Sequence, residues 1–210
     1  MTISVNRMYK FIVILCTLTL FYSCNTTRKM TITEKKLIRS ADVNTAFRVL
    51  LVTEKSDSLV LRKPCRDVDI VNDSLYIKWL ITRMKATMKV ESGVGIAAPQ
   101  IGLSRNVFLF VRVDKTDMPV EVAINPKIIE VPGETVCFER DGCLSIPDVS
   151  GNSIRYPWVK VEYYNENGEK ITEKLTGYSR NDNFVAVIFQ HEFDHLQGIL
   201  FTDKLCEMND

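Results

Sequence analysis

The pattern of apolar and polar positions predicts a long helix in the first half of the chain, running to about Val90. Asn72 or Asp73 is a suitable N-cap, and Arg83 and Lys85 fall on the face away from the apolar positions. The apolar positions recur every three or four residues and comprise Ile77, Leu80, Ile81, Met84 and Met88. We interpret this stripe as a helix face that packs into the core.

A second helix is predicted near the end of the chain. Residues 184–189 are apolar throughout, and Phe193 continues them at helical spacing. Asp182 or Asn183 can cap the start of this helix, and Gly198 is a typical residue just beyond a helix end. The composition indicates a deeply buried helix.

Between and before these helices the pattern favours short strands. Strands are expected at residues 46–52, 107–113, 120–124, 128–131, 135–139, 158–164 and 171–175. The last two alternate apolar and polar residues around the turn sequence 165–168, which is typical of a hairpin. Residues 59–64 are expected to be extended, ending at Pro64. We therefore predict an α+β fold in which antiparallel strands pack around a central metal-binding helix, within a single domain at residues 41–210.

The first 23 residues differ from the rest. Arg7 and Lys10 precede an apolar run at residues 11–21, which is shorter than the 18 or so residues that a membrane-spanning helix needs. This pattern predicts a signal peptide at residues 1–23, followed by a lipidated Cys24 and a polar tether at 24–40. The localisation expected from it is the cell envelope, as a membrane-anchored lipoprotein. An uncleaved anchor, or a start at Met8 and a cytoplasmic protein, are the alternatives.

Composition changes this picture little. The chain has 210 residues, of which 46% are hydrophobic, and its formal net charge is +1. These values suit one globular domain and give no support to nucleic-acid binding. We expect a monomer.

Outside the leader the cysteines are Cys65, Cys137, Cys143 and Cys206. If one of them binds a metal, the others cannot all form disulfides, and we expect those others to pack in the core.

The candidate chemistry lies on the second helix, where His191 and His195 are the only histidines of the chain. Residues four apart share a helix face, so both imidazoles can bind one cation. Glu192 stands beside the first of them, where a carboxylate can take a proton from a water at that cation. The same spacing occurs by chance on amphipathic helices, but two buried imidazoles need partners.

A third ligand is required, and no third histidine exists. Asp203 and Glu207 follow His195 but belong to a short tail, whereas Cys143 lies upstream between a glycine and a predicted turn. A thiolate with two imidazoles leaves a fourth position open for water, as a catalytic metal site requires, and this favours Cys143. For that residue alone, a buried structural cysteine is the plainer interpretation. A further loop at residues 93–102 contains two closely spaced glycines and presents the polar residue Gln100.

Three segments together resemble the motifs of the peptide deformylase family, in the family's order. They read Gly-Val-Gly-Ile-Ala-Ala-Pro-Gln at 93–100, Asp-Gly-Cys-Leu-Ser at 141–145 and Gln-His-Glu-Phe-Asp-His at 190–195. The likeness covers about residues 60–205. It implies hydrolysis of the formyl group from N-formylmethionyl peptides, with formate released. It also implies Fe²⁺ as the usual metal, with Zn²⁺ or Ni²⁺ possible, which matches a thiolate and imidazole set.

The resemblance also implies residue roles. Cys143, His191 and His195 become metal ligands, and Glu192 becomes the general acid and base. The side-chain amide of Gln100 and the backbone N–H of Leu144 stabilise the oxyanion that forms.

The resemblance further places the peptide as an added strand near Gly95, with Val94 and Ile188 as walls of the methionine pocket. The family usually has glutamate where this chain has Asp141, and Arg155 matches the ion-pair partner of that carboxylate. We expect altered support of the ligands without loss of a ligand.

The leader conflicts with an activity that usually serves nascent chains in the cytoplasm. One alternative is an exported enzyme acting on other N-acyl peptides, and another is a peptide-binding relic without catalysis. A metallopeptidase is opposed by the lack of a downstream ligand. The presence of both Glu192 and Gln100 favours catalysis.

Overall fold

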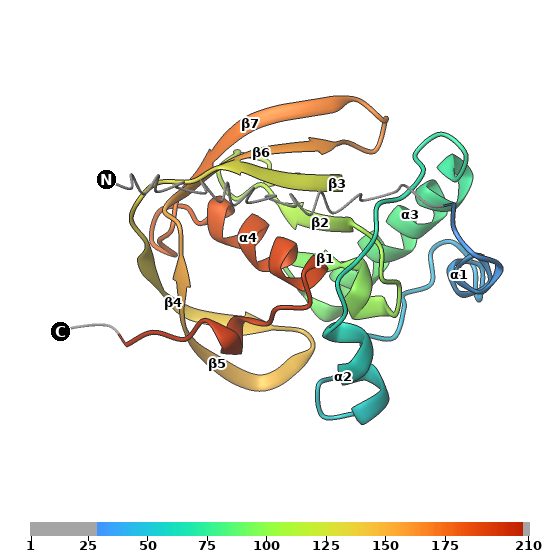
Figure 1. Cartoon of the computed structure of the whole chain (residues 1–210), viewed down its shortest axis with the longest axis horizontal. Helices are drawn as coiled ribbons and strands as arrows, with labels where there is room; N and C mark the ends of the chain where they lie inside the picture. The colour runs from blue at the N-terminus through green and yellow to red at the C-terminus, as the bar shows by residue number, and fades with distance from the viewer. Residues whose placement is uncertain (1–28, 208–210) are drawn as a thin grey trace, which may run out of the picture.

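The computed structural model describes residues 29–207 (Figure 1). Its α-helices are α1 (Ile32–Ile38), α2 (Lys55–Leu61), α3 (Ser74–Glu91) and α4 (Val185–Leu196), with short 3₁₀ helices η1 (Ala98–Ile101) and η2 (Phe201–Asp203). Its strands are β1 (Gly95–Ala97), β2 (Val107–Val111), β3 (Val120–Glu130), β4 (Val136–Cys143), β5 (Ile146–Arg155), β6 (Trp158–Tyr164) and β7 (Lys170–Thr176). The expected signal peptide and Cys24 lie outside the described residues.

The strands form two antiparallel sheets. The larger sheet has the order β1-β2-β3-β6-β7, and β4 pairs with β5 in a separate two-stranded sheet. Figure 1 shows α4 crossing the centre of the molecule, with β4 and β5 on one side and α1 at the opposite end. The predicted α+β class, with antiparallel strands around a central helix, is confirmed.

The core is built on both faces of β2. Val107 and Leu109 point into a cluster with the apolar stripe of α3, whereas Phe108 and Phe110 point into a second cluster with α4. All four side chains are fully buried. Because both faces of this strand are covered by helices, β2 lacks polar alternation and its sequence is a continuous apolar run. Packing against β2 therefore fixes the position of α4 on the sheet.

The two long helices begin and end close to their predicted bounds. Asp73 precedes α3, but its carboxylate accepts from the N–H of Met30 instead of capping the helix. The N-cap position of α4 is Phe184. The side chain of the preceding residue, Asn183, accepts a hydrogen bond from the N–H of Val185 at 3.0 Å and so caps the first turn. Gly198, at φ +74°, follows the end of α4 as expected.

Two predictions for the segment before α3 are wrong. Residues 46–52 form no strand, because the N–H groups of Phe47, Leu50 and Val52 bond to Thr87 Oγ1 and to the carbonyls of Gln100 and Ser145 rather than to a neighbouring strand. Residues 59–61 belong to helix α2 instead of an extended segment, since Leu61 is fully buried on that helix. Pro64 follows the helix end, where proline is common.

Two strand predictions also change. The expected strands at 120–124 and 128–131 are one strand, β3, with an irregular register between Ile124 and Lys127 around Pro126. The strand β5 was not predicted. It contains Pro147 and Gly151 and four consecutive exposed residues, so the apolar alternation that identifies a half-buried strand is weak.

Residues 29–40 are folded on the domain rather than forming a tether. Ile38 is fully buried and Met30 is 4% exposed, both within the α3 cluster. Arg83, expected on the solvent face of α3, is 2% exposed and donates to the carbonyls of Thr45 and Ile38. Arg83 therefore satisfies the hydrogen-bonding capacity of these backbone carbonyls and fixes the segment to α3.

The cysteines divide into three roles. Cys137 and Cys206 form a disulfide between β4 and the C-terminal tail, which corrects the expectation that both simply pack in the core. Cys65 is free and buried, as predicted, and its burial raises the pKa of its thiol to about 12. Cys143 is free and partly exposed.

Within residues 29–207, every helix is too short or too polar to cross a bilayer.

Candidate metal and active site

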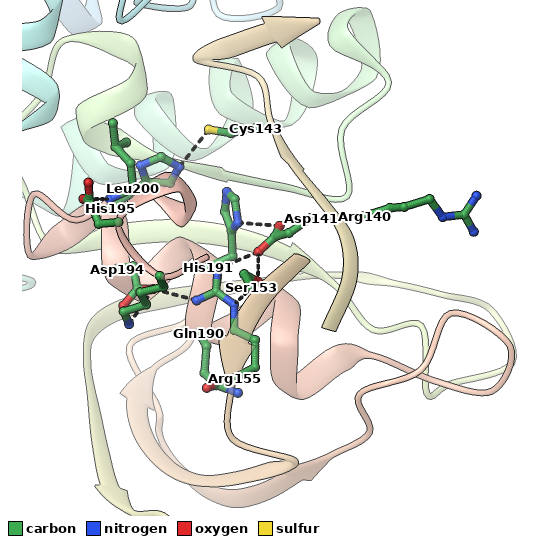
Figure 2. Close-up of polar contacts among 12 residues, drawn as sticks. Arg140, Asp141, Cys143, Ser153, Arg155, Gln190, His191, Asp194, His195 and Leu200 are labelled. Atoms are coloured by element: carbon green, nitrogen blue, oxygen red, sulfur yellow. Dashed lines mark hydrogen bonds and ion pairs between the residues drawn. The ribbon is translucent and has the colours of Figure 1, made fainter. Parts of the chain in front are cut away.

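Three donor groups meet where α4 passes the end of β4. The sulfur of Cys143 and a ring nitrogen from each of His191 and His195 all lie within 4.8 Å of one another. The Cys143 Sγ to His195 Nε2 distance is 3.2 Å (Figure 2). Helical spacing places both rings on the same buried face of α4, and the sheet that packs under α4 holds them there. The structure thus brings together the three residues predicted as ligands.

A carboxylate orients the first histidine. Asp141 Oδ1 lies 3.0 Å from Nδ1 of His191. The second oxygen, Oδ2, accepts from Ser153 Oγ and from Arg155 Nη2, each at 2.6 Å (Figure 2). Burial alone would raise the pKa of Asp141, but the bond from His191 and the charge of Arg155 hold it well below its usual range. An ionised Asp141 keeps the proton of His191 on Nδ1 and leaves Nε2 directed at Cys143.

The same arginine joins a second carboxylate. Arg155 is 1% exposed, and its Nη1 donates to Asp194 Oδ2 at 2.6 Å. Lys204 Nζ also donates to Asp194, at 2.6 Å to Oδ1. Asp194 and Lys204 were not predicted from the sequence, although an acidic residue three after His191 on a buried helix was a usable signal. This network of buried, paired charges connects β4, β5, α4 and the C-terminal tail.

Glu192 is packed against the edge of the large sheet. Its side chain is so close to Gly95 that a Cβ added there would lie 2.3 Å from Oε1. Burial raises the pKa of Glu192 to about 7. Among the described residues, Glu192 Oε2 has no hydrogen-bond partner, and neither has Nδ1 of His195. A buried carboxylate without a protein partner at the floor of a cavity is free to bond to a ligand or water.

Gln100 supplies an oriented amide. Its Oε1 accepts from the N–H of Ala97 at 2.8 Å, which fixes the amide so that Nε2 faces the cysteine. Nε2 lies 3.6 Å from Cys143 Sγ and 3.3 Å from Ser145 Oγ. Leu144 lies in the two-residue turn between β4 and β5, beside Cys143. The predicted oxyanion-stabilising residues therefore both lie beside the metal-ligand cluster.

A cavity of about 340 Å³ is lined by site residues that include Gln100, Cys143, Leu144, His191 and Glu192. Predicted wall residues are present, since Ile188 is buried in its lining and Val94, 46% exposed, stands at its edge. Sequence analysis missed the stacked rings of Phe138 and Phe184, and Arg180, which lies over both. Arg180 also donates to the carbonyls of Glu139 and Arg140, so it joins the loop before α4 to β4. No sequence pattern marked that loop.

The donor set fits a divalent transition metal. One thiolate and two imidazoles are ligands that Fe²⁺, Zn²⁺ and Ni²⁺ all accept. Burial lowers the pKa of His195 well below its usual range, so its imidazole is neutral, the form that binds a metal. Burial also opposes a charge on His191, but its hydrogen bonds to Asp141 and Cys143 raise its pKa well above the usual range. The three donors and their spacing therefore suit a single divalent cation.

Comparison with known proteins agrees with this geometry. The sequence profile of the family described as polypeptide deformylase matches residues 49–210. A peptide deformylase from Christiangramia forsetii is 40% identical over 162 residues, which cover 71% of this chain and 78% of the relative.

Solved structures match as well. Peptide deformylase from Thermotoga maritima has a TM-score of 0.65 and 36% identity, covering 77% of this chain and 99% of the other. The class I type b enzyme from Acinetobacter baumannii, bound to Met-Ala-Ser, has a TM-score of 0.65 and 33% identity, with coverage of 77% and 99%. The chain belongs to the peptide deformylase family.

Proposed function

We propose that this protein removes the N-formyl group from N-formylmethionyl peptides and releases formate. The observation that carries the proposal is the convergence of Cys143, His191 and His195 beside the buried carboxylate of Glu192. Cys143, His191 and Glu192 line one cavity. Family membership supports a deformylation reaction, and the Met-Ala-Ser bound by the Acinetobacter baumannii enzyme supports a peptide as ligand.

Cys143, His191 and His195 would hold the metal, with Fe²⁺ as our proposal and Zn²⁺ or Ni²⁺ as alternatives that the same donors suit. When bound, such a cation supplies a Lewis acid that polarises a carbonyl and makes a water more acidic. Asp141 and Arg155 keep the His191 ring in the orientation that presents Nε2.

Glu192 moves the protons. Its carboxylate accepts a proton from the attacking water as the oxygen of that water bonds to the formyl carbon. It then donates the proton to the amine nitrogen as the C–N bond breaks, so that formate and a free N-terminus leave. The unpartnered Oε2 of Glu192 is the atom available for this transfer.

Gln100 and Leu144 stabilise negative charge. As the formyl carbon becomes tetrahedral, its oxygen gains charge, and preformed N–H donors lower the barrier by about 2.7–4 kcal/mol each. The Gln100 Nε2 donor is oriented before substrate binds, because Ala97 fixes the other end of its amide. The N–H of Leu144 is the second donor that we propose.

The peptide is proposed to lie against β1. This strand is at the edge of the five-stranded sheet, so one side of its backbone is available for an added strand. Its first residue, Gly95, lies beside Glu192. A methionine side chain would enter the apolar part of the cavity, walled by Val94 and Ile188 together with Phe184 and Val187.

A single assay separates this function from its alternatives. Purified protein loaded anaerobically with Fe²⁺ is offered a formyl-Met peptide, an acetyl-Met peptide and casein. Release of formate from the first alone is expected. Hydrolysis of the acetyl peptide would indicate a broader N-acyl hydrolase, cleavage of casein a metallopeptidase, and binding of the peptide without turnover a relic.

Variants assign the roles. Glu192→Ala is expected to keep the metal and lose most turnover. Cys143→Ser is expected to lose metal on dialysis, while Cys65→Ser, the matched change at the other free cysteine within residues 29–207, keeps it. Turnover by Glu192→Ala comparable to the unmodified protein, at equal metal content, would remove that residue from the mechanism.

We also propose that the protein acts in the cell envelope, with its leader cleaved and Cys24 lipidated. The Cys137–Cys206 disulfide supports an oxidising compartment, where such bonds persist. Fractionation with mass measurement of the mature N-terminus tests this. An unlipidated chain beginning at Met1 or Met8 in the cytosol would reject it.

A further inference from the structure

One face of α1 carries cations in its last turn and at its C-cap residue, Arg39. Residues at helical spacing, Ile32, Lys35, Lys36 and Arg39, line a shallow hollow together with Tyr76 of α3. Ile32 is 76% exposed at one end of this row, and Lys36 and Arg39 are exposed beside it. We call these five residues the α1 face. Figure 1 places α1 at the opposite end of the molecule from β4 and β5.

Aromatic rings lie beneath the cations. Lys35 Nζ is 4.6 Å from the centroid of the Tyr76 ring, and the Arg39 guanidinium lies 4.8 Å from Tyr76 and 5.0 Å from Trp79. Leu75, which directly precedes Tyr76 in α3, is 58% exposed. Surfaces that bind lipid headgroups typically combine Lys and Arg side chains with aromatic and aliphatic side chains.

The acids of this region do not cancel the charge. Glu34 is on α1, but Arg105 holds both of its oxygens, at 2.6 and 2.8 Å. Asp73 is fully buried, where it accepts from the N–H of Met30 and pairs with Lys35. Within residues 29–207, Lys36 and Arg39 have no carboxylate partner, so they present positive charge beside the exposed Ile32.

The start of the described chain is next to this face. Residues 22–28 separate Lys29 from the apolar run at 11–21. Even fully extended, seven residues span only about 25 Å. Whether the apolar run or a lipid on Cys24 anchors the protein, the α1 face would therefore stay close to the membrane surface.

We propose that the α1 face binds the anionic phospholipid headgroups of a membrane. Lys36 and Arg39 contact phosphates, and Ile32 and Leu75 reach the boundary of the acyl region. This proposal is independent of the deformylase chemistry. It also orients the enzyme, because Tyr76 is near the start of α3 and the cavity residue Ser92 follows its end, about 24 Å away along the helix axis. Peptides would reach the cavity from the aqueous side.

The test uses residues 29–210, so that the leader cannot contribute. This part is a folding unit, since the Thermotoga maritima enzyme is matched over 99% of its length within 77% of this chain. Co-sedimentation is measured with vesicles of phosphatidylcholine alone and of phosphatidylcholine with phosphatidylglycerol. Binding to the anionic vesicles that falls with added salt is expected.

Paired variants locate the contact. Lys36→Glu/Arg39→Glu should weaken binding at least tenfold, because each cation near an anionic surface contributes roughly a fivefold factor. Lys55→Glu/Lys127→Glu makes the same change in net charge at exposed positions elsewhere and should bind as the unmodified protein does. Formyl-peptide hydrolysis or, if that activity is absent, circular dichroism verifies that each variant is folded.

A fluorescence readout places Trp79. The chain has two tryptophans, so Trp158→Phe leaves Trp79 as the only reporter. Brominated phosphatidylcholine mixed with phosphatidylglycerol should quench it. Absence of binding to anionic vesicles, an equal loss in both charge-reversed pairs, or equal binding to double-stranded DNA would each overturn the proposal.

Discussion

Asp141 contacts Nδ1 of His191 with Oδ1, whereas Oδ2 accepts hydrogen bonds from residues of β5. The 3.0 Å contact to Nδ1 orients the ring, and the far oxygen is held by Ser153 and Arg155. The resemblance to deformylases suggested a longer glutamate at this position. The structure shows that the aspartate still reaches its histidine.

Replacing that carboxylate should weaken metal binding. Asp141→Ala is expected to lower metal affinity about 10–100-fold, since the partner that orients a ligating imidazole is lost. Metal content after dialysis against a graded chelator measures this. Asp141→Glu should restore most of the affinity, and Asp182→Ala, at an exposed acid, should change nothing. Unaltered retention in Asp141→Ala would show that the ring needs no such partner.

A single methyl group should displace Glu192. Gly95→Ala puts a Cβ 2.3 Å from Glu192 Oε1, closer than any real contact, so the carboxylate must move. We expect kcat to fall about 100-fold with metal content unchanged, because a displacement of about 1 Å is enough to cost that much. Gly133→Ala is the control, since nothing lies within 4 Å of its added Cβ. Normal kcat in Gly95→Ala would mean that the position of Glu192 is not critical.

Arg180 should act on substrate binding rather than on the chemical step. Arg180→Met removes its two hydrogen bonds to β4 carbonyls and loosens the Phe138 and Phe184 wall. Losing about 1 kcal/mol of support predicts a KM roughly fivefold higher, with kcat nearly unchanged. Steady-state kinetics with a formyl-Met tripeptide separates the two constants. A fall in kcat alone would contradict a role in the wall, and Arg66→Met, at an exposed arginine, is the matched control.

Arg112 should control acid stability. It is 5% exposed and donates to Asp114, Glu121 and Glu173. Burial by itself would raise the pKa of Glu121, but hydrogen bonds from Lys115 and Arg112 outweigh it and lower that pKa below 4.5. Hydrogen bonding to Arg112 likewise lowers the pKa of Asp114. For acids with lowered pKa, the stabilisation is complete above the unfolded value and disappears as the pH falls through the folded value.

Arg112→Met should therefore cost about 2–4 kcal/mol of unfolding free energy at pH 7, because it leaves the partner carboxylates without their cation. The difference from the unmodified protein should shrink as the pH falls below about 4.5, where those acids become protonated in the unfolded chain. Urea unfolding at several pH values measures this. Lys160→Met, at an exposed ion pair, should have little effect at any pH. A difference that does not change with pH would reject the electrostatic origin.

The elements that were predicted well from the sequence are helices with one buried face, because burial requires apolar residues to recur at helical spacing. The stripe of α3 and the histidine face of α4 are buried along their whole length, so their spacing was visible. Strand β5 was missed because it pairs only with β4 and exposes half of its residues. Helix α2 was missed because residues 59–64 form too short an apolar run to separate a helix from a strand.

The site followed the same rule. The metal-ligand candidates and Glu192 could be found because their chemistry needs particular residue types at fixed spacing. Arg180 could not be found, since its place over the cavity depends on the conformation of a loop. The pairing of Cys137 with Cys206 spans 69 residues and depends on where the tail crosses β4. Contacts set by tertiary structure leave no local pattern to detect.

The Cys137–Cys206 bond closes the chain into a ring, and Cys143, His191, Glu192 and His195 are all members of that ring. A protease that nicks the 165–168 turn would leave every one of these groups covalently joined, so the severed pieces could not drift apart. Enzyme produced in a reducing cytosol would lack the closure and should be more quickly inactivated by such a nick.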